Sequence, residues 1–498
     1  MEQTIAAYRR HMDKIYAIKH ALQILQLDGE TAMPSAGVKS LTPTVGALAA
    51  ESYRLLVDDE FVDILQRMQA QSAELSLFLR RESEEMLREW RKISCIPPDE
   101  YRDFQMAQSQ SSHAWRSAKK NDDYALFEPH LAKMVDYSRR FAGYYAPDQP
   151  AYEVLLDDYE RGLTCATLDA FFARIKDELV PLIDEVAARG RHIDDSFLKA
   201  YFPLAQQKQL ADDIARLMTV DESRCRYAET EHPQTSGTDK YNVRIANHYY
   251  TDDLLSGLYS TVHELGHALY ELNSADELFR SELAHGAGMA IHESQSRLFE
   301  NNIGRSQAFI GMLLPRLQQL FPDSLSGVSA EQMYLAINND RPGAIRTTAG
   351  ELTYPLHILV RYELEQLLIG GDLDTRELPQ LWREKYRQYL GLEIKDDQSG
   401  VLQDSHWSDG LFGYFPDYAI GSAYAAQICA AMARDIDLWG CVAAGDLQPP
   451  VAWLTERIYR SSGLLLPEQV IVNSCRAPFD ASFYIDYLRD KYSQVFAL

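Results

Sequence analysis

Cysteine is scarce in this chain of 498 residues, and its six cysteines include no C-x-x-C pair. Proteins stapled by disulfides carry closely spaced cysteines, so a disulfide framework is not expected and a reducing compartment fits best. The first ten residues lack the apolar core of a signal peptide. The longest apolar run, residues 418–433, is too short to cross a membrane and contains glycine and polar residues. These absences predict a cytoplasmic protein with no membrane partner.

Basic residues are also fewer than acidic ones. The chain has 49 lysines and arginines and 73 aspartates and glutamates, which gives a formal net charge of -24. Such a surface repels the phosphate backbone, so nucleic acid is not expected as a partner. The acidity mainly favours solubility. Because 46% of the residues are hydrophobic and no low-complexity tract is present, the chain can bury a sizeable core.

No Ser- or Gly-rich linker and no repeat of fixed period divides the chain, which predicts one domain over residues 1–498. Apolar residues at intervals of three and four predict helices through most of residues 1–230. Residues 241–250 are the clearest strand candidate, because Val243 and Ile245 alternate with Asn242, Arg244 and Ala246. We predict a mainly α fold with a small sheet, in which residues 231–430 carry the candidate site and residues 431–498 form C-terminal helices.

The strongest chemical signal is His263-Glu-Leu-Gly-His267, which matches H-E-x-x-H. On a helix the four-residue spacing places the two imidazoles about 40° apart, so they can bind one cation together. Glu264 would then accept a proton from metal-bound water as the water attacks a carbonyl carbon. Two buried structural histidines could give the same letters, so a third ligand is needed to support this interpretation.

That third ligand is predicted in the helix-like segment His292-Glu-Ser-Gln295, about 30 residues after His263. Glu293 is the better ligand candidate, and His292 is expected to support a ligand or contact substrate. Two histidines, one glutamate and an open position are typical of catalytic zinc. We expect one divalent metal per subunit, with zinc as the first choice and cobalt as the alternative, since such donors accept several metals.

Several longer stretches, in matching order, resemble the carboxypeptidase Taq family of metallocarboxypeptidases. They are residues 27–34, 155–164, 291–301 and 400–407, of which the last reproduces G-x-x-Q-D-x-H-W. The resemblance covers nearly the whole chain. It implies a saddle-shaped, oligopeptidase-like helical subunit with a central substrate groove, part of whose wall is formed by residues 1–230, and a homodimer.

The resemblance also implies release of C-terminal amino acids from peptides. It assigns the metal to His263, His267 and Glu293, and it assigns activation of water to Glu264. A carboxypeptidase further needs donors that grip the free α-carboxylate. The candidates for this substrate binding are Arg244, Arg346 and Gln403. The candidates for stabilising the oxyanion or the departing amine are His406, Tyr414 and Tyr418.

Two departures from the family pattern fall beside the arginine candidates. The family's D-x-R-x-T is Asn242 to Ala246 here, so Arg244 lacks the acidic residue that would share its strand face. The family's I-R-x-x-A-D has Gly350 in place of its acid, four residues after Arg346. The adjacent Glu351 is a candidate substitute. We expect these departures to change carboxylate anchoring but not the metal chemistry.

Two other functions remain open at this point. An endo-acting metallo-oligopeptidase would use the same water activation without gripping a carboxylate. A catalytically silent peptide-binding homologue would keep the fold, although it should have lost ligands or base, and His263, Glu264, His267 and Glu293 are all present. A substrate with an amidated C-terminus separates the first alternative from a carboxypeptidase.

Overall fold

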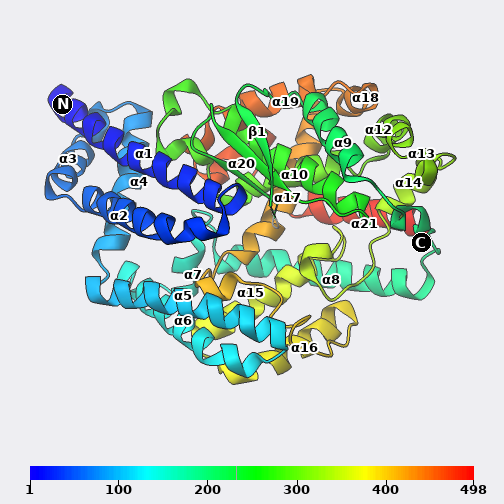
Figure 1. Cartoon of the computed structure of the whole chain (residues 1–498), viewed down its shortest axis with the longest axis horizontal. Helices are drawn as coiled ribbons and strands as arrows, with labels where there is room; N and C mark the ends of the chain where they lie inside the picture. The colour runs from blue at the N-terminus through cyan, green and yellow to red at the C-terminus, as the bar shows by residue number, and fades with distance from the viewer. Residues whose placement is uncertain (231–232) are drawn as a thin grey trace.

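The computed structural model describes residues 1–230 and 233–498, and it is mainly helical with one three-stranded sheet (Figure 1). The predicted fold class is confirmed. The predicted boundary between residues 230 and 231 falls at the edge of the described part, and the assignment to one domain, the saddle shape and the groove stay predictions.

The N-terminal helices lie together at one end of the molecule (Figure 1). They are α1 (Glu2–Thr31), α2 (Val38–Leu56), α3 (Asp59–Ala70) and α4 (Leu77–Ser94). Their buried side chains, including Tyr8, Phe61 and Met86, form an apolar cluster of their own. The strongly amphipathic sequence of α3 explains this, because Phe61, Ile64, Leu65 and Met68 recur at helical spacing and are all buried.

The remaining helices enclose the main core, which extends from Ala118 to Phe496. The helices before the sheet are α5 (Pro98–Asn121), α6 (Tyr124–Tyr145), α7 (Ala151–Leu156), α8 (Cys165–Arg189) and α9 (Leu204–Leu217). Those after it are α10 (Leu254–Leu272), α11 (Met289–Arg297), α12 (Gln307–Leu320), α13 (Pro322–Leu325), α14 (Ala330–Ile337), α15 (Tyr354–Gly370), α16 (Leu378–Leu390), α17 (Phe415–Asp435), α18 (Leu438–Ala444), α19 (Gln448–Leu454), α20 (Pro467–Cys475) and α21 (Ser482–Phe496). Figure 1 shows α5, α6, α15 and α16 in a lower layer, with α10 and α17 near the centre.

The sheet consists of β1 (Cys225–Glu229), β2 (Gln234–Gly237) and β3 (Val243–Asn247) in the order β1-β3-β2. The strand predicted within residues 241–250 is therefore confirmed. β3 pairs parallel with β1 and antiparallel with β2, and Thr235 stands opposite Ile245. Val243 and Ile245 are buried, which fixes the register of β3. β2 contacts α10.

Glycine lets the central helices approach one another closely. A Cβ atom on Gly266 of α10 would lie 2.7 Å from the carbonyl oxygen of Gln295 in α11. A Cβ atom on Gly421 of α17 would lie 2.8 Å from Cβ of Glu293. Both distances are too short for a side chain, so these glycines set the spacing of α10, α11 and α17 around Glu293. Of the helices in the described part of the chain, none has the length and apolar character needed to span a membrane.

Candidate metal centre

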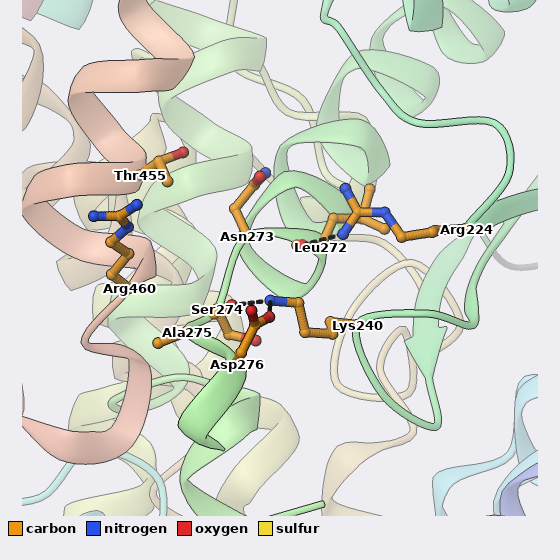
Figure 2. Close-up of a pocket in the computed structure, with 9 residues that line it drawn as sticks. All are labelled: Arg224, Lys240, Leu272, Asn273, Ser274, Ala275, Asp276, Thr455 and Arg460. Carbon is orange, nitrogen blue, oxygen red and sulfur yellow. Dashed lines mark hydrogen bonds and ion pairs between the residues drawn. The ribbon is translucent and has the colours of Figure 1, made fainter. Parts of the chain in front are cut away.

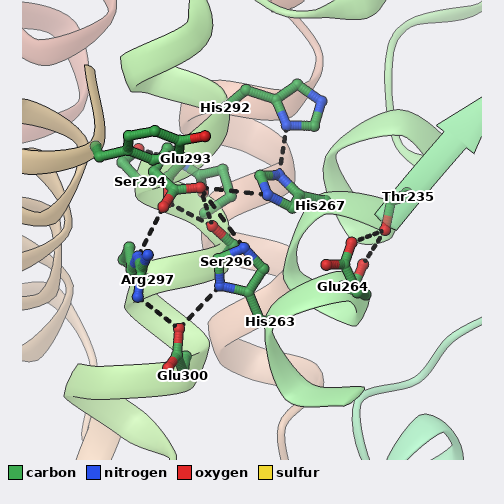
Figure 3. Close-up of polar contacts among 12 residues, drawn as sticks. Thr235, His263, Glu264, His267, His292, Glu293, Ser294, Ser296, Arg297 and Glu300 are labelled. Carbon is green, nitrogen blue, oxygen red and sulfur yellow. Dashed lines mark hydrogen bonds and ion pairs between the residues drawn. The ribbon is translucent and has the colours of Figure 1, made fainter. Parts of the chain in front are cut away.

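Two adjacent helices bring the three predicted metal ligands together. His263 and His267 lie one turn apart on α10, and Glu293 faces them from α11 (Figure 3). Their ligand atoms all lie within 4.8 Å of one another. Nε2 of His263 and Nε2 of His267 are 3.6 and 3.4 Å from Oε2 of Glu293. Two imidazoles and one carboxylate converging on one point are a donor set that fits zinc.

A carboxylate behind His263 fixes the orientation of its ring. Nδ1 of His263 lies 2.8 Å from Oε2 of Glu300, in the π-helical segment η6 (Leu298–Ile303) that continues α11. Because an ionised carboxylate can only accept, Nδ1 carries the proton and Nε2 is left free to bind a metal. Burial opposes ionisation of Glu300, but Arg297 and His263 lower its pKa to about 2.

His267 is held through a second histidine. Its Nδ1 lies 2.6 Å from Nδ1 of His292, whose Nε2 lies 3.0 Å from Oε1 of Glu271. Since Glu271 accepts from His292, Nδ1 of His292 is the acceptor for His267, and Nε2 of His267 faces Glu293 unprotonated. Burial opposes ionisation of Glu271, but His285 and His292 lower its pKa to about 2. The expectation that His292 supports a ligand agrees with this geometry.

Glu293 is buried and ionised. Nε of Arg297 donates to its Oε1 at 2.7 Å, and the Ser296 hydroxyl donates to its Oε2 at 3.1 Å. Burial alone would raise the pKa of Glu293, but Arg297 and the two facing histidines lower it below its usual range. The helix spacing of four residues between Glu293 and Arg297 makes this ion pair possible.

Glu264 is oriented by the sheet. It is buried in α10, and the Thr235 hydroxyl of β2 donates to its Oε2 at 2.6 Å (Figure 3). Burial raises the pKa of Glu264, which brings the carboxyl group nearer to the range useful for accepting a proton at neutral pH. Thr235 lies 29 residues before Glu264, and no local sequence signal indicates this contact.

Arg244 keeps one polar support in spite of the missing acid. Its Nε donates to Oδ1 of Asn242 at 2.8 Å. Arg244 is only partly buried on β3, and this side-chain hydrogen bond leaves its two terminal nitrogens available. Asn242 therefore retains a hydrogen bond that orients Arg244, but it lacks the negative charge of the acidic residue in the family pattern.

Arg346 has a different partner from the one that the family pattern indicates. Its Nε and Nη2 donate to Oδ1 of Asp404 at 3.0 and 2.8 Å, and its Nη1 donates to the Tyr354 hydroxyl at 2.9 Å. Arg361 donates to the other oxygen of Asp404 at 2.7 and 2.5 Å. Asp404 thus joins two buried arginines, which lower its pKa against the effect of burial. The D of the Q-D-x-H-W stretch is the sequence signal that could have indicated it.

Gly350 and Glu351 do not supply the missing acid. A Cβ atom on Gly350 would overlap the carboxyl group of Asp340, which accepts from the backbone N–H groups of Leu352 and Thr353 at 2.7 and 3.0 Å. Glu351 instead forms a buried ion pair with Lys491. The suggestion that Glu351 substitutes for the lost partner of Arg346 is therefore wrong, because its carboxylate faces α21.

The other predicted site residues gather around Arg346. Oε1 of Gln403 accepts from the Arg346 backbone N–H at 2.8 Å. Nε2 of His406 lies 3.2 Å from the Tyr418 hydroxyl, and the Tyr414 and Tyr418 rings are 5.1 Å apart. Burial lowers the pKa of His406 to about 4 and raises those of Tyr414 and Tyr418, and the charge of Glu293 contributes to both tyrosine shifts. These three side chains are therefore neutral at pH 7, and the two tyrosines lie within electrostatic reach of Glu293.

A cavity of about 420 Å³ lies at the C-terminal end of α10, and none of the three predicted metal ligands lines it (Figure 2). Nη1 of Arg224 donates to the carbonyl oxygen of Leu272 at 2.8 Å. Nζ of Lys240 donates to the carbonyl oxygen of Ser274 at 2.5 Å and to Asp276 at 2.7 Å. A cation bound to a last carbonyl stabilises a helix end, so Arg224 holds the end of the helix that carries the histidines, and Lys240 holds the turn that follows it.

A helical molecule with a small sheet, in which two packed helices present His, His and Glu to one point, has the architecture of a metallopeptidase. The chain belongs to the carboxypeptidase Taq (M32) metallopeptidase family, whose model matches residues 7–492. The resemblance drawn from the motifs is thus confirmed, and the chain is a metallocarboxypeptidase, a peptide hydrolase.

Known relatives align with the chain over its full length. Carboxypeptidase 1 of Bacillus subtilis (strain 168) is 33% identical over 494 residues, covering 98% of this chain and 99% of the relative. Thermostable carboxypeptidase 1 of Pyrococcus furiosus is 33% identical over 501 residues, covering 99% and 98%. The M32 carboxypeptidase structure from Deinococcus radiodurans R1 matches with a TM-score of 0.95 at 31% identity and covers 100% of both chains.

Proposed function

We propose that this metallocarboxypeptidase holds one divalent metal, zinc or alternatively cobalt, on His263, His267 and Glu293, and uses Glu264 as general base to release C-terminal amino acids. The convergence of the three ligand atoms beside Glu264 carries this proposal. When bound, the metal supplies Lewis acidity, which polarises the scissile carbonyl and lowers the pKa of water.

Glu264 receives the proton of the attacking water. The Thr235 hydroxyl holds one carboxylate oxygen of Glu264, so the other oxygen can accept the proton. The raised pKa of Glu264 then lets the protonated carboxyl pass its proton to the departing amine. β2 positions the base by this contact while α10 positions the two histidines.

Arg244 is the proposed anchor for the substrate α-carboxylate. With Nε held by Asn242, its terminal nitrogens can donate to a carboxylate and set the scissile bond one residue from the end. Arg346 is already bonded to Asp404 and Tyr354, so we assign it and Gln403 to the wall of the substrate site near Tyr418.

Tyr414 and Tyr418 are the proposed donors to the oxyanion or to the departing amine. Burial raises the pKa of both, so each keeps its hydroxyl proton at neutral pH. His406 orients the Tyr418 hydroxyl through its Nε2. We further propose a homodimer, a cytoplasmic location and a groove that accepts extended peptides, in keeping with the family resemblance.

The test compares one short peptide as its free acid and as its C-terminal amide. Metal-loaded protein and Glu264→Gln are each incubated with both peptides, and products are followed by mass spectrometry. Stepwise loss of single residues from the free acid alone, absent with Glu264→Gln, is the expected result. Internal cleavage of both peptides would instead establish an oligopeptidase, and no cleavage by protein with bound metal would establish a silent homologue.

A further inference from the structure

The N-terminal end of α11 is capped by a side chain that is distant in sequence. Gly288 precedes the helix and offers no side-chain cap. Instead the backbone N–H of Ala290 donates to Oε2 of Glu160 at 2.9 Å, and the N–H of Ile291 also acts to lower the pKa of this carboxyl group. A Cβ atom on Gly288 would overlap Glu160 Oε2, so only glycine leaves room for this cap. Glu160 thus fixes the turn of α11 that precedes Glu293.

Asp417, in the first turn of α17, reaches the same helix end. One turn further along α17, Gly421 packs against α11, where a Cβ atom would lie 3.0 Å from the carbonyl oxygen of Ala290. The rings of Tyr159 and Tyr414 are 5.1 Å apart, which brings the segment of Glu160 beside the start of α17. Glu160 and the first turn of α17 therefore lie at the same end of α11, and Asp417 and Glu160 are only 2% and 1% exposed.

These two carboxyl groups lack the donors that other buried carboxylates of the molecule have. Neither oxygen of Asp417 has a hydrogen-bond partner in the described part of the chain, and neither does Oε1 of Glu160. The charged groups that act on Asp417 are all acidic: Glu160, Glu293 of α11 and Glu365 of α15. Arg297, the cation of α11, is engaged with Glu293 and Glu300. Two ionised carboxylates in this position would repel each other at low dielectric.

We propose that Glu160 and Asp417 share one proton, and that this carboxyl pair is a positioning device for Glu293. The proton forms a hydrogen bond between Oε1 of Glu160 and one oxygen of Asp417, which gives a partner to two of the three oxygens that lack one. The single remaining negative charge lies at the N-terminal ends of α11 and α17, where both helix dipoles favour it. The positioning role rests on the proposed function of Glu293 as a ligand, whereas the shared proton does not.

The electrostatic environment agrees with this geometry. Burial raises the pKa of Glu160 to about 8, against the effect of the two backbone N–H donors. Burial, followed by the charge of Glu160, raises the pKa of Asp417 well above its usual range. When two carboxyl groups interact this strongly, the pair loses its two protons in separate steps and holds one proton between them.

Infrared spectroscopy tests the shared proton without reference to catalysis. Full-length metal-free protein at neutral pH should show a carbonyl stretch of a protonated carboxyl group that shifts on labelling with carboxyl-13C aspartate or glutamate. Asp417→Asn and Glu160→Gln should each lose this band, because an amide N–H then replaces the proton. Glu365→Gln is the control for the other buried carboxyl nearby, whose pKa burial raises to about 7; it should leave the band of the pair in place. A spectrum that neither Asp417→Asn nor the isotope labels change would overturn the proposal. Loss of the band on adding sodium, potassium or magnesium would also overturn it, because a bound cation would then take the place of the proton.

Metal release into a chelator tests the positioning role separately. Glu160→Ala should release metal about tenfold faster than the wild type, a size typical of lost support behind a ligand. Glu160→Gln should restore slow release, since its amide can accept from Ala290 and donate to Asp417. If Glu160→Ala and Glu160→Gln behaved alike, the positioning role would be rejected. A shared proton with unchanged metal release would limit the pair to a structural function, and failure of wild-type protein to bind metal would instead refute the proposed function.

Discussion

The metal side and the carboxylate-anchoring side of the site differ in how their charged groups are supported. On the metal side, the carboxylate of Glu300 supports His263, and the guanidinium of Arg297 supports Glu293, so two of the proposed ligands have a charged partner. On the anchoring side, Arg346 has such a partner in Asp404, but Arg244 has only the neutral amide of Asn242. A guanidinium that is already paired with a carboxylate has less charge to offer a substrate carboxylate than one that is bonded only to a neutral amide. This difference supports the proposal that Arg244 anchors the substrate carboxylate.

The largest effect is expected from a substitution that affects the metal side alone. Glu264→Gln removes the proton acceptor and should lower kcat by about 10²- to 10⁴-fold, the usual range for a general base. The metal content, measured by atomic emission, should not change, because Glu264 is not among the converging ligand atoms. Loss of bound metal from this variant would contradict the assignment of its role.

Glu300→Gln weakens the support of one ligand while keeping its shape. The amide can no longer attract the Nδ1 proton of His263 as a carboxylate does, so metal affinity should fall by about 10- to 100-fold. Competition with a chelator measures the change. Glu331→Gln, on an exposed part of α14, is a control that should leave the affinity unaltered.

Arg244→Gln breaks the anchoring side. The loss of charge-assisted hydrogen bonds should lower kcat/KM for a free-acid peptide by about 10- to 100-fold. Arg226→Gln is a matched control, since Arg226 is an exposed arginine of the neighbouring strand β1. If both substitutions affected the peptide equally, Arg244 would not be the anchor.

Asp340, whose carboxyl group lies beside Gly350 on the anchoring side, is expected to make the stability of the protein depend on pH. Burial raises its pKa to about 6, above an unfolded value of about 3.8. The folded protein then binds the proton more tightly, so this contribution to stability is fully present below pH 3.8 and is lost as pH rises to 6. From the shift, the loss is on the order of 2 to 3 kcal/mol. The free energy of unfolding, measured with denaturant at pH 4.5 and pH 7, should change less with pH for Asp340→Asn than for the wild type. An equal change in the two proteins would exclude this contribution.

Asn242→Asp gives the smallest effect and restores charge beside Arg244. An acidic partner would hold the guanidinium more firmly but would also offset part of its charge, so KM for a free-acid peptide should change by only about twofold to fivefold. Steady-state kinetics with peptides of one sequence measure it. A change as large as that of Arg244→Gln would show that the charge of residue 242 dominates anchoring.

Much of the site could be predicted because its signals are local. The four-residue spacing of His263 and His267 requires one helix face, and alternation at Val243 and Ile245 indicated β3. The supports could not be predicted in this way, since they join distant segments. Thr235 meets Glu264 only because β2 pairs with β3, and Asp340 occupies the space beside Gly350 only because two loops pack together.

The contact between α10 and α11 at Gly266 has a consequence for metal uptake. With the backbones this close, the separation between the histidines and Glu293 is set by rigid main chain, and the hydrogen bonds of Glu300 and Arg297 already select the side-chain rotamers. Little conformational entropy remains to be lost when an ion enters. The centre is preorganised, and we expect metal to bind at a rate limited by dehydration of the ion and access to the site, with no ordering step of the protein.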